Sequence, residues 1–367
     1  MYIFFSKLSK IPLSLLILII IVNVIGIFTL YSASNLDFYP FVYKQLINFL
    51  LFLFISLIIS TIELKTIYKL SYYIYIFCII LLLATEIIGH KAMGASRWFN
   101  IFGFKIQPSE FIKIGLVLFL AKYYHNISRT NLNKFSSIFI PMIFTIIPTF
   151  IVMKQPDLGT SMIIILSSGI IVFSSGTRVK HLIYCISPII VSIPLIWQFL
   201  YDYQKKRMLM FLNPESDPLG SGYNIIQSKI AIGSGGLFGK GFGLGTQSKL
   251  DFLPEHETDF IFSCFAEETG FIGAIILIIL YFIIIVKSLS IALNSRSIYG
   301  KILGLGIIAI FFLHIFINIA MVSGIFPVTG KPLPFMSYGR NIVASMLIGF
   351  GLIMNVHIHQ KENFIKS

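Results

Sequence analysis

Long runs of apolar residues recur along the whole chain, and each is about the length of a membrane-spanning helix. A helix needs roughly 20 predominantly apolar residues to cross the hydrocarbon core of a bilayer. Polar stretches separate the runs, and only the stretch at residues 201–259 is long. The pattern predicts ten spans, at residues 11–31, 43–62, 70–89, 108–125, 137–153, 158–176, 182–200, 260–286, 302–322 and 339–356.

The composition agrees with this pattern. Of the 367 residues, 56% are hydrophobic and only 12% are charged, and the mean hydropathy is +0.89. A soluble domain has about twice that share of charged residues. We therefore expect an all-α polytopic membrane protein that forms a single transmembrane domain over residues 1–367.

The basic residues predict how the chain lies in the membrane. With the N-terminus inside, the inner segments hold 14 Lys and Arg residues, and the short outer loops hold seven. Because positive charge favours the cytoplasmic side, both termini are expected in the cytoplasm and residues 201–259 outside. The net charge of +13 is spread over these loops, so membrane lipid is the expected anionic partner and nucleic acid is not.

The acidic residues are distributed unevenly. On this topology 13 of the 15 Asp and Glu residues lie in outer loops or at outer ends of spans. This predicts a polar site at the extracytoplasmic face, although outer loops also tolerate acids without any function. The three cysteines and seven histidines show no spacing typical of a disulfide framework or a metal site.

The stretch "LPEHETDFIF" (253–262) is the strongest local signal for a site. It places Glu255, Glu257 and Asp259 against the start of an apolar run. Partial burial and the nearby acids would raise the pKa of Asp259 above its ordinary value of roughly 3.9, which would make it a better proton acceptor. The alternative is an acid that interacts only with the dipole of the following helix.

Two further motifs place charges at outer ends of predicted spans. In "QPSEFIK" (107–113), Glu110 and Lys113 share one helix face, and they are expected either to support a site or to form a structural ion pair. In "MKQPDLGTS" (153–161), Asp157 is expected to cap the next helix.

The glycine-rich stretch "IGSGGLFGKGFGLGTQSK" (232–249) matches neither a P-loop nor a dinucleotide-binding loop. The P-loop spacing fails, and Gly241 occupies the position of the Ser or Thr that would hold magnesium. Two interpretations remain: a flexible loop whose backbone closely approaches a ligand, or a plain connector.

Several stretches together resemble one family. They are "MGASRWFNIFGFKIQPSEFIK" (93–113), "QPDLGTS" (155–161), "FLNPESDPLGSGYNIIQSKIAIGSGGLFGKG" (211–241), "GTQSKLDFLPEHETDFIFSCFAEETG" (245–270) and "PVTGKPLPFMSYG" (327–339). In order and spacing they are similar to the SEDS family (shape, elongation, division and sporulation), and they look most like its elongation members.

The resemblance implies a peptidoglycan glycosyltransferase that polymerises lipid II at the outer face of the cytoplasmic (inner) membrane. It also implies a class B penicillin-binding protein as partner, within the elongation machinery. The residue that matches the family's catalytic aspartate is Asp259. Trp98, Glu110, Lys113 and Asp157 match other site positions of the family.

This activity needs a base for the acceptor hydroxyl and cations for the departing pyrophosphate. We expect Asp259 to be the base, and a divalent cation such as Mg²⁺ could assist, although no dedicated ligand set is visible. Two other functions fit less well: a lipid II flippase and a non-catalytic scaffold. The candidate cations are Arg97, Lys113, Arg207 and Lys240.

The chain departs from the family pattern at two positions. Glu257 occupies the place of a histidine, with His256 one position earlier, and Arg340 occupies the place of a glycine. We expect the first change to alter the acidity of Asp259. The second is expected either to disturb helix packing or to add a phosphate contact.

Overall fold

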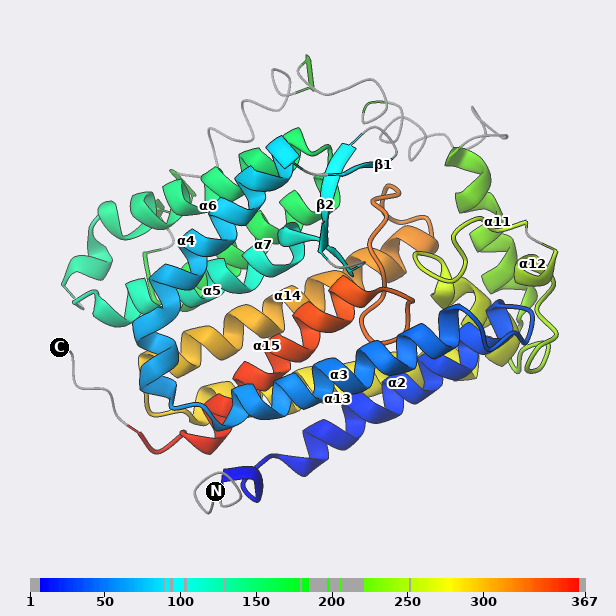
Figure 1. The fold of residues 1–367 in the computed structure, drawn as a ribbon, viewed down its shortest axis with the longest axis horizontal. Helices are drawn as coiled ribbons and strands as arrows, with labels where there is room; N and C mark the ends of the chain where they lie inside the picture. Colours follow the sequence, from blue (N-terminus) through cyan, green and yellow to red (C-terminus); the bar gives the residue numbers. More distant parts are fainter. Residues whose placement is uncertain are drawn as a thin grey trace.

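The computed structural model is a bundle of helices with a small sheet at one end (Figure 1). It describes residues 7–88, 90–92, 95–101, 104–128, 130–178, 180–181, 183–184, 197–198, 205, 221–250 and 252–362.

Helices occupy nine of the ten predicted spans. The first span is predicted within two residues at each end. Helix α4 begins six residues before the predicted span, because the prediction excluded the charged residues Lys65 and Lys69 of its first turns. Most of the predicted seventh span, 182–200, lies outside the described residues. The nine helices are α2 (Leu13–Ala33), α3 (Phe41–Thr61), α4 (Leu64–Ile88), α5 (Pro108–Asn126), α6 (Ser136–Lys154), α7 (Leu158–Ser174), α13 (Ile261–Asn294), α14 (Ile298–Val322) and α15 (Arg340–Ile358).

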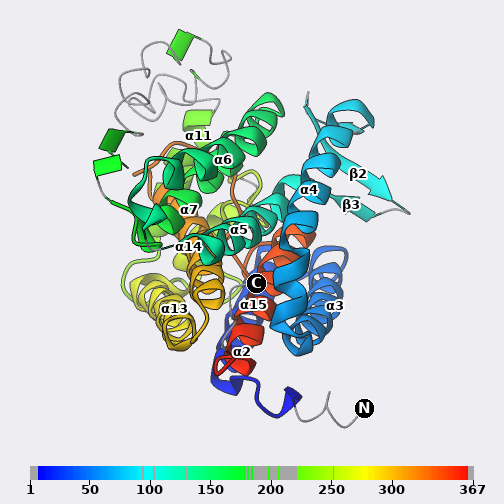
Figure 2. The same ribbon diagram turned by 90° about the vertical axis from the view of Figure 1, so that its left-hand side faces the viewer.

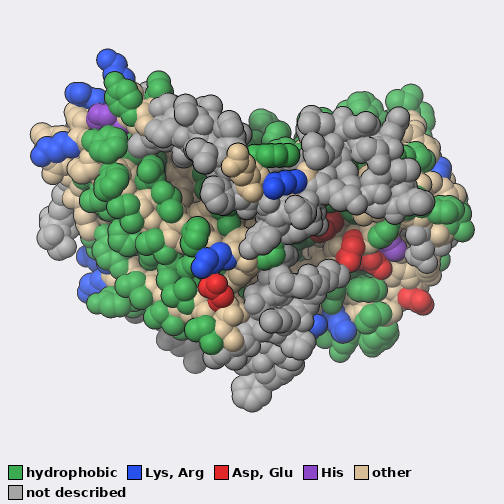
Figure 3. Space-filling model, turned by 90° about the horizontal axis from the view of Figure 1, so that it is seen from above, with side chains coloured by type: hydrophobic (Ala, Val, Ile, Leu, Met, Phe, Trp, Pro, Cys, Tyr) green, Lys and Arg blue, Asp and Glu red, His purple; other side chains and the backbone are tan. Residues whose placement is uncertain are grey.

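Within the described residues, seven helices are long and apolar enough to cross a membrane. Helix α5 is not among them, since it carries three charged residues, and α7 has only 17 residues. In Figure 3 apolar side chains cover much of the described part of the face, and acidic side chains are few there. Large exposed side chains such as Phe54, Phe77 and Phe282 are typical of helices that face lipid. The chain is a helical polytopic membrane protein.

The prediction of an all-α chain is wrong between α4 and α5. Strands β1 (His90–Ala92), β2 (Ala95–Ile101) and β3 (Phe104–Ile106) form an antiparallel sheet in the order β1-β2-β3. Phe99 pairs with Ile106 and Ile101 with Phe104. Strand β2 contains Trp98, Phe99 and Ile101, which favour strands, but the segment is too short for its alternation to stand out.

The long connection, predicted as a loop over 201–259, contains two helices. Helix α11 spans Ser221–Ser234 and α12 spans Thr246–Lys249. The predicted start of the eighth span lies within one residue of the start of α13 at Ile261, but α13 is broken at Gly270, whose φ of 69° and ψ of −167° are not helical. The apolar residues before the break therefore belong to a separate short segment, and the long straight part of α13 begins after it.

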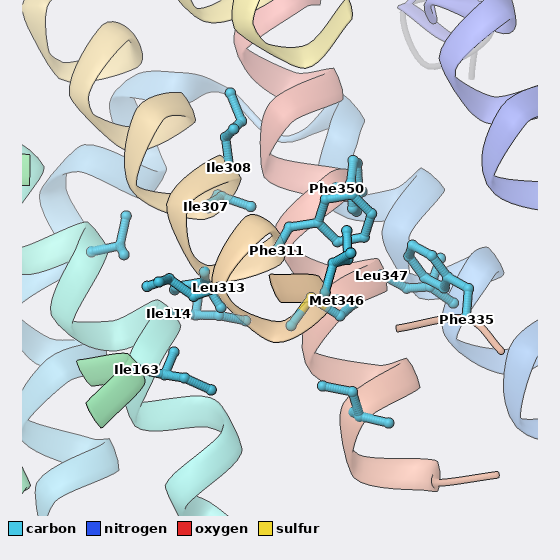
Figure 4. Close-up of a cluster of buried hydrophobic side chains, with 14 of the residues drawn as sticks. Ile114, Ile163, Ile307, Ile308, Phe311, Leu313, Phe335, Met346, Leu347 and Phe350 are labelled. Carbon is cyan, nitrogen blue, oxygen red and sulfur yellow. The ribbon is translucent and has the colours of Figure 1, made fainter. Parts of the chain in front are cut away.

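The core lies around α15, which Figure 2 shows in the middle of the bundle with α3, α5, α13 and α14 about it. An aromatic cluster is formed by Phe311 of α14, Phe350 of α15 and Phe335, which precedes α15 (Figure 4). The Phe311 and Phe350 rings meet edge to face at 4.9 Å between centroids. Burial of such side chains stabilises the packing of α14 against α15.

The two ends of the bundle contain different parts of the chain. Lys7, before α2, donates to the carbonyl of Thr61 (3.0 Å). Asn355, near the end of α15, donates to the carbonyl of Ile62 (2.6 Å). We call this the terminal end, because both described ends of the chain lie there (Figure 1). The opposite end, where α5, α7, α13 and α15 begin, is the site end.

Candidate active site

A cavity of about 480 Å³ opens at the site end of the bundle. Its wall is formed by β2, the first turns of α5, α7 and α15, the turn before α13, and the segment 327–339 between α14 and α15. The charged residues that line it are Glu110, Asp157, Glu255, Asp259, Lys331 and Arg340.

Asp259 lies in the turn that leads into α13. Its backbone N–H donates to the carbonyl of Glu255 (3.1 Å), and its carbonyl accepts from the Asn318 side chain (2.8 Å). The same Asn318 amide donates to the carbonyl of Lys331 (2.6 Å). One buried side chain of α14 therefore fixes Asp259 and Lys331 on adjoining walls of the cavity.

Gly330 allows the second wall to approach Asp259 closely. Its φ is +65°, and a Cβ at this position would lie 3.1 Å from the Asp259 carboxylate oxygen Oδ2. A side chain here would crowd the carboxylate and strain the backbone. The raised pKa predicted for Asp259 stays a prediction.

Lys331 forms a buried ion pair that the sequence analysis did not identify. Its Nζ lies 2.9 Å from Asp157 Oδ1 and also donates to the Thr160 hydroxyl. Asp157 accepts from the backbone N–H of Thr160 (3.0 Å), so the predicted cap of α7 is confirmed. Burial raises the pKa of Asp157, but the Lys331 ammonium and the hydrogen bonds from Thr160 outweigh it and lower the pKa to about 2.

Glu110 and Lys113 form the predicted pair below the cavity. Lys113 Nζ lies 2.7 Å from Glu110 Oε2 and 2.6 Å from Nε2 of His314 on α14. Glu110 also accepts from the Ser345 hydroxyl (3.3 Å). Glu110 lines the cavity, whereas Lys113 is not among the lining residues and is buried beneath it. The pair thus connects α5, α14 and α15 under the floor of the site.

Arg340 begins α15 and lines the cavity. Its Nε donates to Asn48 Oδ1 on α3 (3.0 Å), so α15 packs against α3 despite the long cation. The neighbouring Asn341 accepts from the N–H of Gln107 (3.1 Å) and donates to the carbonyl of Lys105 (3.2 Å). The expectation that Arg340 disturbs helix packing is therefore wrong, and the expected phosphate contact stays a prediction.

Glu255 and Glu257 face different surroundings. Glu255 lines the cavity and accepts from the Thr258 hydroxyl (3.0 Å). Glu257 is not among the lining residues and lies 3.4 Å from His256 Nε2. His256 itself is buried, with Nδ1 2.8 Å from the carbonyl oxygen of Leu253. The change from the family's histidine therefore falls behind the wall of the cavity.

Trp98 lines the cavity from β2, and the Lys105 ammonium lies 5.7 Å from the centre of its ring. Two buried polar atoms of the wall, Trp98 Nε1 and Thr329 Oγ1, have no hydrogen-bond partner among the described residues. Unsatisfied polar atoms at a cavity suit a polar ligand. Of the other candidates, Arg97 belongs to β2 but its side chain lies outside the description, and Arg207 lies outside the described residues altogether.

Lys240 lies apart from the cavity. Its Nζ is 2.6 Å from Oε1 of Glu267 on α13, and it is not among the lining residues. The glycine-rich stretch packs its backbone against α13, since Lys240 N–H donates to the Glu267 carbonyl (3.0 Å). Neither expectation for this stretch anticipated that contact with a helix.

A metal site is not evident in the part of the chain that the structure describes, where no three His, Cys, Asp or Glu side chains are grouped to hold an ion. The cavity carboxylates are more widely spread. Mg²⁺ usually binds one or two carboxylates together with substrate phosphates, so the predicted divalent cation would need the substrate to complete its shell.

The sequence analysis did not identify several residues of this candidate site. Lys331, Asn318 and His314 line the cavity or hold its walls. Asn318 and His314 are polar residues surrounded by apolar ones in the sequence of α14. A polar residue in such a run usually faces the interior of a bundle, and this signal was available.

These features define a class of protein: a helical membrane protein with a polar, charged cavity at one end of its bundle. The family model described as "Cell cycle protein", of the FtsW, RodA and SpoVE proteins, matches residues 10–362. The chain belongs to this family.

Individual relatives agree with the family. The chain is 41% identical over 359 residues to the peptidoglycan glycosyltransferase MrdB of Escherichia coli (strain K12), covering 98% of this chain and 96% of that protein. A structure described as a peptidoglycan synthase complex that coordinates polymerization and crosslinking is similar with a TM-score of 0.82 and 26% identity, covering 96% of this chain and 99% of that one. The rod shape determining protein RodA of Thermus thermophilus has the same fold, with a TM-score of 0.72 and 24% identity, covering 96% and 98% of the two chains.

Proposed function

We propose that this protein polymerises lipid II into glycan strands during cell elongation. Its class, peptidoglycan glycosyltransferase, is that of the MrdB protein, which it matches over nearly its whole length. The observation that carries the proposal is the cavity in which Asp259 and Lys331 occupy adjoining walls joined by Asn318. This arrangement joins the backbones of a proton acceptor and of a cationic residue that line the same cavity.

In the proposed reaction the C4 hydroxyl of an acceptor sugar attacks the anomeric carbon of the lipid-linked strand. The Asp259 carboxylate accepts the hydroxyl proton as the new C–O bond forms. The bond to the pyrophosphate breaks on the opposite face, so the configuration inverts and undecaprenyl pyrophosphate leaves. Attack and departure thus require a base and a cation on two sides of one carbon.

Lys331 and Arg340 are the cations best placed for the pyrophosphate, because both line the cavity. Arginine and lysine pair well with phosphate oxygens. Lys113 lies below the floor and supports the site through Glu110. Lys240 does not line the cavity and therefore has no part in this mechanism, and Arg97 and Arg207 remain candidates.

The substrate explains the position of the site. Its tail must stay in lipid and its sugars in water, so a cavity at the end of a membrane bundle suits it. The proposal includes ten spans, both termini in the cytoplasm, and the site at the extracytoplasmic face of the inner membrane. The partner is a class B penicillin-binding protein, supported by the likeness to a synthase complex that polymerises and crosslinks.

The test is polymerisation of purified lipid II by purified protein in detergent, with strands separated on a gel. Asp259→Asn is expected to lower the rate about 10²- to 10⁴-fold, the range for loss of a general base. Asp37→Asn, the same substitution at an exposed aspartate of the α2–α3 connection that does not line the cavity, serves as the matched control and should stay within about threefold of wild type. A normal rate for a folded Asp259→Asn protein would exclude the base. Failure of wild type to make any strands would favour the flippase or the scaffold.

A further inference from the structure

The glycine-rich loop, residues 235–245, exposes an unusual amount of apolar surface. Leu237, Phe238, Phe242 and Leu244 are exposed by 62%, 80%, 55% and 61%. A segment facing water rarely carries four large apolar side chains so close together. Such a surface needs an apolar partner.

The single charged residue of the loop does not share this surface. Lys240 is the only charged residue in 235–245, and its ammonium pairs with Glu267, which is fully buried. It also donates to the Thr246 hydroxyl (2.9 Å). The charge is therefore neutralised on the side that faces α13, and the outward side is apolar.

Several backbone donors of the loop are satisfied from within the protein. Gly241 N–H donates to the Glu268 carbonyl (3.0 Å), and Gly243 N–H donates to the Glu268 carboxylate (3.2 Å). Gly239 N–H donates to Gly235 (2.8 Å) and Leu244 N–H to Gly241 (3.1 Å). Backbone donors satisfied in this way are what a segment needs in hydrocarbon, where water cannot pair with them.

The break of α13 makes these contacts possible. Gly239 and Gly270 approach so closely that a Cβ on Gly270 would lie 2.3 Å from Gly239 N. In the other direction, the Phe271 N–H of α13 donates to the Gly236 carbonyl of the loop (2.9 Å). The loop is thus fastened to the first turn of the long part of α13.

The apolar surface of the loop continues that of the membrane helix α2. Phe242 meets Phe28 of α2 edge to face, at 6.4 Å between ring centroids, and Phe28 is itself exposed by 59%. Phe28 lies five residues before the end of α2 at Ala33, which is about 7.5 Å along the axis. The loop is therefore level with the last turns of a span rather than beyond its end.

From these observations we infer that residues 235–245 form an interfacial loop that inserts its apolar side chains among the acyl chains of the leaflet at the site end. The partner is membrane lipid. An apolar segment buried about 5–10 Å below the headgroups holds its attachment point at a constant depth. The loop would thereby hold α13, and the Asp259 turn at its start, at a constant level relative to the bilayer.

Depth-dependent quenching tests the inference in the full-length protein. A fluorescent label is attached at Phe238→Cys in a background with Cys78, Cys185 and Cys264 changed to alanine, and the protein is reconstituted into phosphatidylcholine vesicles. Quenching by lipids with a nitroxide on the acyl chain is compared with quenching by iodide. Asp37→Cys, in the exposed α2–α3 connection, is the control for water, and Phe282→Cys, exposed on α13, is the control for lipid.

We expect acyl-chain quenching at position 238 to exceed that at position 37 by at least about threefold and to approach that at position 282. Glu267→Gln, which weakens the attachment of the loop, should lower quenching at 238 and leave 282 unchanged. Iodide quenching at 238 equal to that at 37 would overturn the inference. Shielding from both quenchers would overturn it too, because a protein surface would then cover the loop.

Discussion

Arg340 begins α15 in a position where a cation interacts unfavourably with the helix dipole. Its Nε is nevertheless held by Asn48 of α3 (3.0 Å), and it lines the cavity. A cation kept at this cost and anchored by a neighbour suits an anionic ligand. In the proposed function, the residue that replaces a glycine of the family pattern therefore contributes a phosphate contact, and its position in the cavity wall supports this proposal.

We predict that Arg340→Gln raises the KM for lipid II about tenfold and changes kcat less. One charge-assisted hydrogen bond to a phosphate stabilises binding by about 1.5–3 kcal/mol. A change of about 1.4 kcal/mol in binding free energy corresponds to a tenfold change in the dissociation constant. The polymerisation assay at several lipid II concentrations separates the two constants. Arg178→Gln is the matched control, since Arg178 makes the same 3.0 Å contact to Asn133 away from the cavity. An unchanged KM for Arg340→Gln would contradict a phosphate contact.

Asp157 provides a pH dependence with a defined sign. Its folded pKa of about 2 is below the ordinary 3.8, so the unfolded chain takes up the proton first as pH falls. The pair stabilises the folded state by about 2 kcal/mol above roughly pH 4, and this contribution is lost between about pH 4 and pH 2.

Thermal unfolding in detergent, followed from pH 2 to pH 6, is the measurement for this pair. Asp157→Asn should remove the contribution of this pair to the free energy of unfolding, which wild type loses only as pH falls. The melting temperatures of the variant and of wild type should therefore converge as pH falls. Lys331→Met leaves Asp157 buried without its cation, which raises the folded pKa of that carboxyl, so the loss of stability between about pH 4 and pH 2 should be smaller in this variant than in wild type. Parallel curves for wild type and Asp157→Asn would show that the pair does not titrate in this range.

At the scale of elements, four polar side chains from four helices hold the segment 327–339. Asn23 of α2 donates to the Phe335 carbonyl (3.0 Å), Gln45 of α3 to Ser337 (3.0 Å), and Tyr281 of α13 to Pro334 (2.6 Å). Asn318 of α14 is the fourth. A loop within a bundle needs internal partners for its carbonyls, and these residues supply them.

The break of α13 gives a prediction about helix geometry. Gly270→Ala should lower the stability by about 2 kcal/mol or more, because its φ and ψ are almost restricted to glycine and a Cβ would collide with Gly239. Gly233→Ala in α11 is the control, since nothing lies within 4 Å of its Cβ position, and it should be neutral or slightly stabilising. The melting temperatures of both variants in detergent are compared with wild type. Equal values for the two would mean that the break is not required.

The helices were predictable to the extent that an apolar run coincides with a span. That rule placed nine helices but not the break at Gly270, because "AEETGFIG" continues straight into the apolar run. It also missed β2 and α11, which have no long apolar run and are stabilised by their neighbours. Hydropathy describes how a segment meets lipid, not how it meets another segment.

At the scale of the molecule, the site was predicted in part. Trp98, Glu110, Asp157, Glu255 and Asp259 come from distant parts of the chain and line one cavity. Lys331 could not be distinguished from other outer lysines, because its role depends on Asp157, 174 positions away. For the same reason Lys240 was grouped with the substrate cations, although it pairs with Glu267.

Orientation in the membrane is the remaining property of the whole molecule. The two-to-one excess of Lys and Arg in the segments of the terminal end predicts that this end lies in the cytoplasm and the site end outside. In cells with permeabilised outer membranes and no native cysteines, a membrane-impermeant maleimide should label Asp37→Cys at the site end. It should not label Asn294→Cys, exposed where α13 ends at the terminal end, until the inner membrane is lysed. The reverse pattern would place the cavity in the cytoplasm. Glycan strands made there would be on the wrong side of the membrane to join the wall, so the orientation and the proposed function depend on each other.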